Sequence, residues 1–218
     1  MVIDDTADTP SHTGTAAEAD HVIPLRRSTI DRVLIGFGVI TTAVLLAAGG
    51  LLMWGANFSD DYVHRELSSQ NVFFPDRAAL EGEGRDDLVQ YAGEQVTTGK
   101  QAEAYASYID GHLAGIADGK TYSEIDDRGA AEAVTAAEEA GADPAEIAEL
   151  QATADQLKAQ RDTLFKGETL RGLLLSSYAW ATIGTIAGIA AWVAFAGALL
   201  MAILTVAGVV HLRRMTAA

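Results

Sequence analysis

The sequence of 218 residues contains no cysteine. This absence excludes disulfide bonds, thiolate catalysis, lipid attachment through a cysteine and cysteine-based metal sites. An exported domain without disulfides has to be held together by packing alone. The composition therefore fits a bacterial inner membrane better than a eukaryotic secretory route.

Charge is missing from two long stretches, which run from Val33 to Phe58 and from Leu173 to Val210. About 20 apolar residues are enough for a helix to cross the hydrocarbon core of a bilayer. We therefore expect an all-α fold with one transmembrane helix at 33–58 and a second one inside a long apolar helix at 172–210. Because neither stretch contains an Asp, Glu, Lys, Arg or His, we expect no proton relay or ion path through the spans.

A cleaved signal peptide is the alternative interpretation of the first stretch. The stretch begins only after about 32 residues, is longer than the apolar region of a typical signal peptide and lacks a clear cleavage site. We therefore expect an uncleaved signal anchor.

Basic residues flank the two stretches on the sides that face the termini: Arg26, Arg27 and Arg32 before the first, Arg213 and Arg214 after the second. Lys and Arg beside a span are retained on the cytoplasmic side. Residues 60–171 carry 24 Asp and Glu against 10 Lys and Arg, so they hold most of the net charge of −15. We expect both termini in the cytoplasm and residues 59–171 outside, as an acidic domain that repels nucleic acid.

Residues 1–30 are acidic and show no periodic apolar pattern, a composition that buries too little apolar surface to fold. They predict a disordered cytoplasmic tail, and residues 211–218 predict a short cytoplasmic tail at the other end.

The middle segment predicts short helices that form a bundle. The first long helix should continue past Phe58 until Pro75 stops it, followed by a loop at 81–85 and helices at 86–95 and 100–116. In the helix at 100–116 the predicted packing face consists of Ala104, Tyr108, His112 and Ile116. The sequence Thr121 to Glu124 is typical of a helix-capping box.

An Ala-rich and Glu-rich helix is predicted at 130–140. Gly141 should end it, and Asp143 should cap a new helix that has Pro144 in its first turn. A seam of mostly apolar residues follows, spaced three and four positions apart along the sequence. After this seam, Lys166-Gly167 predicts a corner. The seam consists of Ile147, Leu150, Ala154, Leu157, Arg161 and Leu164.

The second apolar stretch is too long for a bilayer. As a helix, 38 residues would extend about 57 Å, against a hydrocarbon thickness of about 30 Å. Anchoring at Arg213 puts the outer boundary near Trp192, or near 183–186 with strong tilt, and leaves Leu173 to Trp180 outside. The candidates for side chains at the membrane interface are aromatic: Trp54, Phe58, Tyr178, Trp180 and Trp192.

Small residues on both spans allow close helix contact. The candidates are Gly184 and Gly188 on the second span, with Gly36 and Gly38 as the partner face on the first. Packing of the two spans on each other is the preferred interpretation, and contact with another membrane subunit is the alternative.

The sequence offers little for catalysis. His64 and Glu66 with His112 superficially match a two-histidine, one-carboxylate iron site. However, His64 and Glu66 lie on a predicted helix, a scaffold that does not suit such a site, and His112 is better explained as a packed core residue. Phosphate loops, nucleophile elbows and zinc-protease helices are absent. We therefore expect no enzyme activity, no cofactor and no metal.

Three strings resemble a group of two-span membrane proteins of actinobacteria: 71–75 (NVFFP), 118–125 (DGKTYSEI) and 165–175 (FKGETLRGLLL). The resemblance covers most of the chain from Val33 to Arg214. Some members carry a label of aromatic ring-opening dioxygenase, which the residues of this sequence do not support. The resemblance implies a membrane location and a two-span architecture, and it implies no catalytic residues.

The preferred functional prediction is a non-catalytic accessory or scaffolding subunit that contacts other membrane or envelope proteins as well as the bilayer. A membrane-anchored sensor or small-ligand-binding module is the alternative, and an enzyme ranks third. A sensor needs a cytoplasmic output element, and the few residues after Val210 favour scaffolding. The identity of the partner and the oligomeric state stay open.

Overall fold

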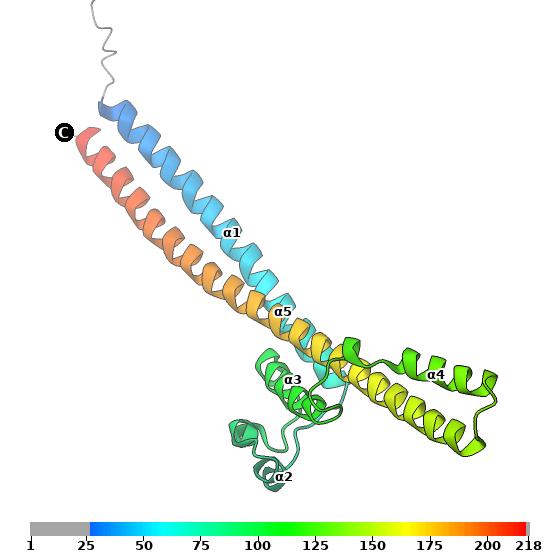
Figure 1. The fold of residues 1–218 in the computed structure, drawn as a ribbon. Helices are drawn as coiled ribbons and strands as arrows, with labels where there is room; N and C mark the ends of the chain where they lie inside the picture. The colour runs from blue at the N-terminus through cyan, green and yellow to red at the C-terminus, as the bar shows by residue number, and fades with distance from the viewer. Residues whose placement is uncertain (1–26, 217–218) are drawn as a thin grey trace, which may run out of the picture.

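The computed structural model describes residues 27–216 (Figure 1). Two long helices enclose five short ones: α1 (Arg27–Ser69), α2 (Arg77–Gly82), the 3-10 helix η1 (Asp86–Tyr91), α3 (Gly99–Ala114), the 3-10 helix η2 (Tyr122–Glu124), α4 (Asp127–Glu139) and α5 (Pro144–Thr216). Within the described residues, the only extended pairing is an isolated antiparallel bridge between Phe73 and Gln95. The all-α prediction is therefore confirmed for this part of the chain. Most of the predicted disordered tail, residues 1–26, lies outside it; the prediction is wrong for residues 27–30, which belong to α1.

The long helices α1 and α5 lie side by side and run antiparallel (Figure 1). Their contacts follow one register, in which the residue number on α5 falls as the number on α1 rises. Gly38 packs against Thr205, Gly49 against the ring of Phe195, and Gly184 against Ser59. The pairing extends from one end of α1 nearly to the other without a slip.

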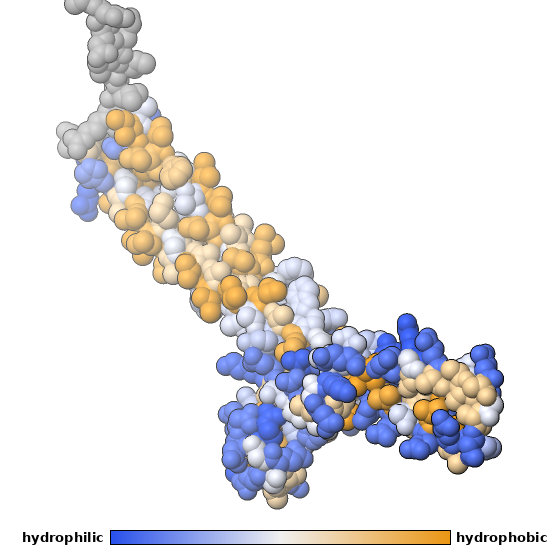
Figure 2. All heavy atoms as spheres, in the orientation of Figure 1, coloured by the Kyte–Doolittle hydropathy of each residue, from blue (hydrophilic) through white to orange (hydrophobic). Residues whose placement is uncertain are grey.

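Both long helices are apolar enough to cross a membrane: within the described residues the candidates are Thr29–Ser69 and Pro144–Met215. Their outward side chains are mostly apolar and exposed, and they form the continuous hydrophobic band of Figure 2. The other end of the molecule is mostly hydrophilic, with smaller apolar patches in the same view. Two chemically distinct regions therefore share one pair of helices.

A single stripe of partly covered side chains runs along α5 from Ile147 to Leu212, with steps of three and four residues. This spacing keeps one side of a helix facing its neighbours. Three helices use the stripe in turn: α4 at its start, α3 in its middle and α1 beyond (Figure 1). Among the described residues α3 and α4 contact α5 but not each other. The segment between the long helices thus forms two separate lobes, where the sequence predicted one bundle.

The first lobe, here called the arm, is a hairpin of α4 and the start of α5. The carboxylate of Asp126 accepts a hydrogen bond from the Gly129 amide at 2.8 Å and starts α4. Gly141 adopts a φ of +69°, which favours glycine and permits the sharp reversal. Asp143 then caps α5 through the Ala145 amide at 2.8 Å. The predicted cap at Asp143 and helix start at Pro144 are confirmed.

The predicted corner at Lys166-Gly167 is wrong, because α5 passes through it without a break. The glycine has another role. A Cβ on Gly167 would collide with the Leu113 side chain of α3, so glycine permits the close approach of these helices. A glycine in a helical pattern has two explanations, a break or a close contact, and the sequence alone does not distinguish them.

The second lobe, here called the α3 lobe, contains α2, η1 and α3, and most of the differences from the sequence predictions lie in it. α1 ends at Ser69, before Phe73 and Pro75, and Asn71 turns the chain with a φ of +54°. The segment predicted as a loop at 81–85 partly belongs to α2, and the predicted helix at 86–95 is a 3-10 turn that ends at Tyr91.

The packing face of α3 also differs from the prediction. Its buried side chains are Ala102, Ala106 and Leu113, which face α5, whereas His112 is exposed. Gly99 begins this face, and a Cβ there would collide with Ala181. Alanine-rich helices offer several apolar faces of similar quality, so the choice of face depends on what the neighbouring helix presents.

The core of the α3 lobe lies where α1, α3 and α5 meet. It contains Val63 and Leu67 from α1, Ala102 and Ala106 from α3, and Leu174 from α5, together with the buried ring of Phe74. Phe74 stacks on Tyr91 and meets Tyr105 edge-on, both with ring centroids 5.2 Å apart. The apolar run 173–180 is therefore covered on one side by this protein itself.

Neighbouring leucines provide a matched test of this core. Leu174 is 6% exposed and Leu173 is 63% exposed. Leu174→Glu should lower the free energy of unfolding by about 3 kcal/mol, because it places a carboxylate in an apolar core. Leu173→Glu should leave it nearly unchanged. Thermal unfolding of the detergent-solubilised variants measures both, and equal midpoints would contradict the core assignment.

Candidate interaction surfaces

The predicted interface aromatics fall on two levels of the α1–α5 pair. Trp54 and Trp192 lie at the same level, because Gly49 faces Phe195 and Ala56 faces Gly188 in the antiparallel register. Both indole side chains are exposed. A second level lies about 18 Å further along α5, at Trp180, given the helical rise of 1.5 Å per residue.

Phe58 connects the two levels on α1. Its ring stacks on Trp54 at 5.7 Å and on Tyr62 at 6.1 Å between centroids, which makes a ladder along one side of the helix. Tyr178 differs from the other candidates, because it is only partly exposed and its backbone packs against Gly99 of α3. It belongs to the docking site of α3.

The glycines predicted for helix packing differ in what they contact. A Cβ on Gly184 would stand 2.8 Å from the Cβ of Ser59, and one on Gly188 would stand 3.6 Å from the Cβ of Ala56. Gly38 packs against Thr205, but a Cβ on Gly36 would meet nothing within 4 Å. Gly36 is therefore not part of the α1–α5 contact, and the sequence analysis missed Gly49, which is.

Gly184 also admits a hydrogen bond between the long helices. The hydroxyl of Ser59, which is 4% exposed, donates to the Trp180 carbonyl at 2.7 Å. Carbonyls inside a helix are usually reached only by their own helix, so this bond needs the close approach that glycine permits. It joins α1 to α5 where the apolar band meets the α3 lobe.

Beside this point an apolar groove of about 370 Å³ lies between α1 and α5. We call it the collar groove. Exposed side chains of Tyr62, Leu170, Leu173 and Trp180 line it, and Glu66 and Gln70 form its polar end. Large apolar side chains that are exposed together are typical of contact surfaces.

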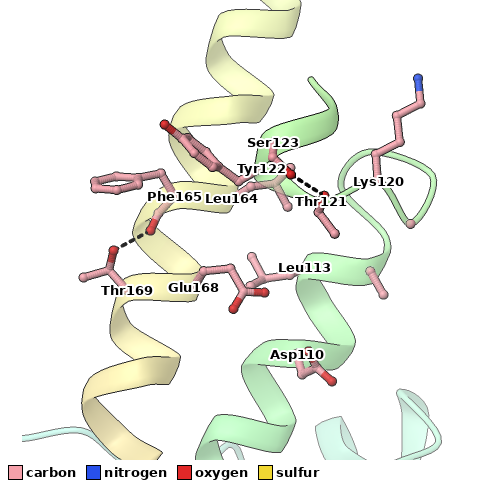
Figure 3. A pocket seen from close by; sticks show the side chains of 12 residues that line it. Asp110, Leu113, Lys120, Thr121, Tyr122, Ser123, Leu164, Phe165, Glu168 and Thr169 are labelled. Carbon is pink, nitrogen blue, oxygen red and sulfur yellow. Dashed lines mark hydrogen bonds between the residues drawn. The ribbon is translucent and has the colours of Figure 1, made fainter. Parts of the chain in front are cut away.

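A larger cleft of about 680 Å³ lies between the end of α3, the turn at η2 and the middle of α5 (Figure 3). We call it the α3–α5 cleft. Its floor is a second apolar cluster, which contains Leu113 and Leu164 and is separate from the core of the α3 lobe. Phe165 and Tyr122 stand at one side with ring centroids 5.5 Å apart, and Asp110 and Glu168 add carboxylates.

The turn that forms one wall of the cleft is held by the predicted Thr121–Glu124 pair. The backbone amide and the hydroxyl of Thr121 both donate to the Glu124 carboxylate at 2.7 Å. These bonds lower the pKa of Glu124 below its ordinary value. The predicted capping residues are therefore confirmed, although they cap a 3-10 turn and the following helix starts at Asp127.

A polar network joins the η1 turn to α3. The Arg85 guanidinium donates to both Asp87 oxygens, at 3.0 and 2.9 Å, and to the Ser107 carbonyl at 2.9 Å. Its hydrogen bonds lower the pKa of Asp87 and raise the pKa of Arg85. Sequence reasoning missed this network, because Ser107 follows Arg85 by 22 residues in the chain.

The residues of the discounted iron site do not come together. His112 pairs with Glu83, with 3.7 Å between Nε2 and Oε2, and its Nδ1 lies 3.1 Å from the Tyr108 carbonyl. Between residues 27 and 216 no group of three or more His, Asp or Glu side chains converges to hold a metal ion. The prediction of a core histidine at 112 is wrong, because its side chain is about half exposed.

No protein-family profile, curated protein sequence or solved structure matches this chain.

The Arg85–Asp87 ion pair predicts a pH dependence of stability. The folded-state pKa of Asp87 is below its ordinary value, so its contribution is present above about pH 4 and is lost as pH falls through the lowered pKa. Asp87→Asn should cost less than about 1 kcal/mol at pH 6, because the Asp87 side chain is largely exposed to solvent, and the cost should be smaller at pH 2. Chemical unfolding at both values measures the difference. Asp86→Asn is the matched control. A cost of Asp87→Asn that is larger at pH 2 than at pH 6 would contradict the assignment.

Proposed function

We propose that this protein is an integral membrane scaffold, a non-catalytic accessory subunit that presents a rigid helical arm to other envelope proteins. The observation that carries the proposal is the continuity of α5. One unbroken helix of 73 residues joins the apolar band to the tip of the arm. Other helices cover α5 along most of its length, and a helix braced in this way holds its two ends at a fixed distance from each other.

The dimensions of the apolar band support placement in a bilayer. From Arg32 to Trp54 along α1 is about 33 Å, and from Trp192 to Arg213 along α5 is about 32 Å. Both lengths match a hydrocarbon core of about 30 Å with basic residues at one side and tryptophans at the other. By the positive-inside rule we assign both termini to the cytoplasm of a bacterial cell and the acidic lobes to the outside.

In this placement the tip of the arm stands well away from the lipid. The length of α5 from Trp192 to Pro144 is about 72 Å. The collar groove lies between the bilayer and the arm. Leu173 and Trp180 are exposed in this groove and do not belong to the core of the α3 lobe. We assign the contact with partner proteins to this groove and to the arm.

The second candidate function is a membrane-anchored module that binds a small ligand. The α3–α5 cleft favours it, because its volume of about 680 Å³ falls in the range that small-molecule sites occupy. The two functions use different surfaces and are compatible in one molecule.

The absence of cysteine makes topology directly measurable, because any introduced cysteine is unique. Glu139→Cys, at the tip of the arm, should react with a membrane-impermeant maleimide on intact cells. Met215→Cys, near the end of α5, should react only after lysis. Labelling of Met215→Cys on intact cells, with Glu139→Cys protected, would reverse the proposed orientation.

The scaffold proposal is tested at the collar groove. Purification of the tagged protein in mild detergent should recover envelope proteins at a fixed stoichiometry, identified by mass spectrometry. Leu173→Glu should reduce that recovery at least about tenfold, because a carboxylate would be desolvated in the contact. Leu173→Met retains apolar character and should preserve recovery. Equal recovery from both variants, or no partner for the wild type, argues against the scaffold.

A further inference from the structure

We infer that the α3–α5 cleft binds a small organic cation with an apolar body, such as an aryl or alkyl ammonium compound. This site rests on the second candidate function, the ligand-binding module, and does not depend on the scaffold. The cleft shares no lining residue with the collar groove and has different chemistry. Three properties of its lining point to this ligand class: an exposed aromatic pair, an excess of carboxylate and an apolar floor.

The apolar part of the lining is exposed in a way that packing does not explain. Leu164 is 2% exposed and belongs to the core, whereas the adjacent Phe165 is 55% exposed. The Phe165 ring contacts Tyr122 and no other aromatic ring among the described residues. In Figure 3 it projects from α5 at the level of the η2 turn. An exposed phenyl ring at the edge of a cleft is available to an apolar ligand.

The aromatic pair also suits a positive charge. The guanidinium of Arg161 lies over the Tyr122 ring with 4.5 Å to its centroid, so this ring already accepts a cation on one face. Phe165 has no cation of this kind among the described residues. Aromatic faces attract ammonium groups more strongly when water is partly excluded, as it is in a cleft.

The carboxylates of the cleft exceed the cations that neutralise them. Asp110 and Glu168 share one partner, Arg171, at 3.4 and 3.0 Å. Figure 3 shows Glu168 directed into the space between the helices. Lys120 also lines the cleft, but in Figure 3 its ammonium points away from both of these carboxylates, and its charge acts on the carboxylate of Glu124. One negative charge is therefore left for a ligand, next to an apolar floor.

The charge of the whole domain reinforces this preference. Residues 60–171 carry 24 acidic against 10 basic side chains, so the surrounding potential concentrates cations and repels anions. An anionic ligand would have to overcome both this field and the carboxylates of the cleft. An uncharged ligand would gain nothing from either.

Binding is tested on the full chain in nanodiscs of zwitterionic lipid by titration calorimetry with benzyltrimethylammonium. The wild type should bind one equivalent saturably. Glu168→Gln should weaken binding about fivefold, the effect of a partly exposed ion pair. Phe165→Leu keeps an apolar side chain but removes the aromatic face, and it should weaken binding at least about threefold. Glu146→Gln, on the arm, is the matched charge control and should bind like the wild type.

Two further probes separate the contributions. Phenylacetate has the aryl group with the opposite charge and should not bind, and tetramethylammonium lacks the apolar body and should bind more weakly. Absence of saturable binding, equal binding of phenylacetate, or an equal effect of Glu146→Gln would each overturn the proposal.

A second measurement needs neither the Glu168 nor the Phe165 variant. Ser123→Cys places a unique thiol at the cleft wall, and benzyltrimethylammonium should slow its reaction with a maleimide by the fraction of sites occupied. Ala142→Cys, in the turn of the arm, should react at the same rate with and without the ligand. Equal rates at Ser123→Cys at a saturating concentration of ligand would place the binding elsewhere and overturn the proposal.

Discussion

The packing of three helices on one side of α5 is the interaction on which the rest of the structure depends. Isolated helices shorter than about 12–15 residues are marginally stable in water; α4, with 13 residues, falls in this range, and α3, with 16, barely exceeds it. Each becomes stable by covering part of the α5 stripe. Among the described helices α4 contacts α5 alone, so α5 positions the arm, whereas α3 is positioned by α5 together with the end of α1.

Close approach along this stripe relies on glycine in both chemical regions of the molecule. Gly167 and Gly99 bring α3 against α5 in the hydrophilic part, and Gly184, Gly49 and Gly38 bring α1 against α5 towards and within the apolar band. The driving forces differ. In water, apolar burial stabilises the contact, whereas a contact within lipid, where the proposed function puts the apolar band, would gain from van der Waals packing. One structural device would then serve in both solvents.

The two proposed activities use separate surfaces of this frame. The collar groove is apolar and lies beside the band, where a partner protein would bury Leu173 and Trp180. The α3–α5 cleft lies further along α5 and combines aromatic rings with carboxylates. Residues of α5 line both surfaces. A ligand in the cleft and a partner in the collar groove would therefore contact the same helix.

The sequence by itself determined the features that depend on local chemistry and on hydrophobic length. The uncharged stretches, the cap at Asp143 and the seam from Ile147 to Leu164 are all visible in it, because helix caps and apolar periodicity act within a few residues. Only the tertiary structure decided which face of α3 is buried, whether Gly167 bends or packs, and that Arg85 meets Ser107. Those outcomes depend on the surface that a distant helix presents, and an alanine-rich chain offers several such surfaces of nearly equal apolarity.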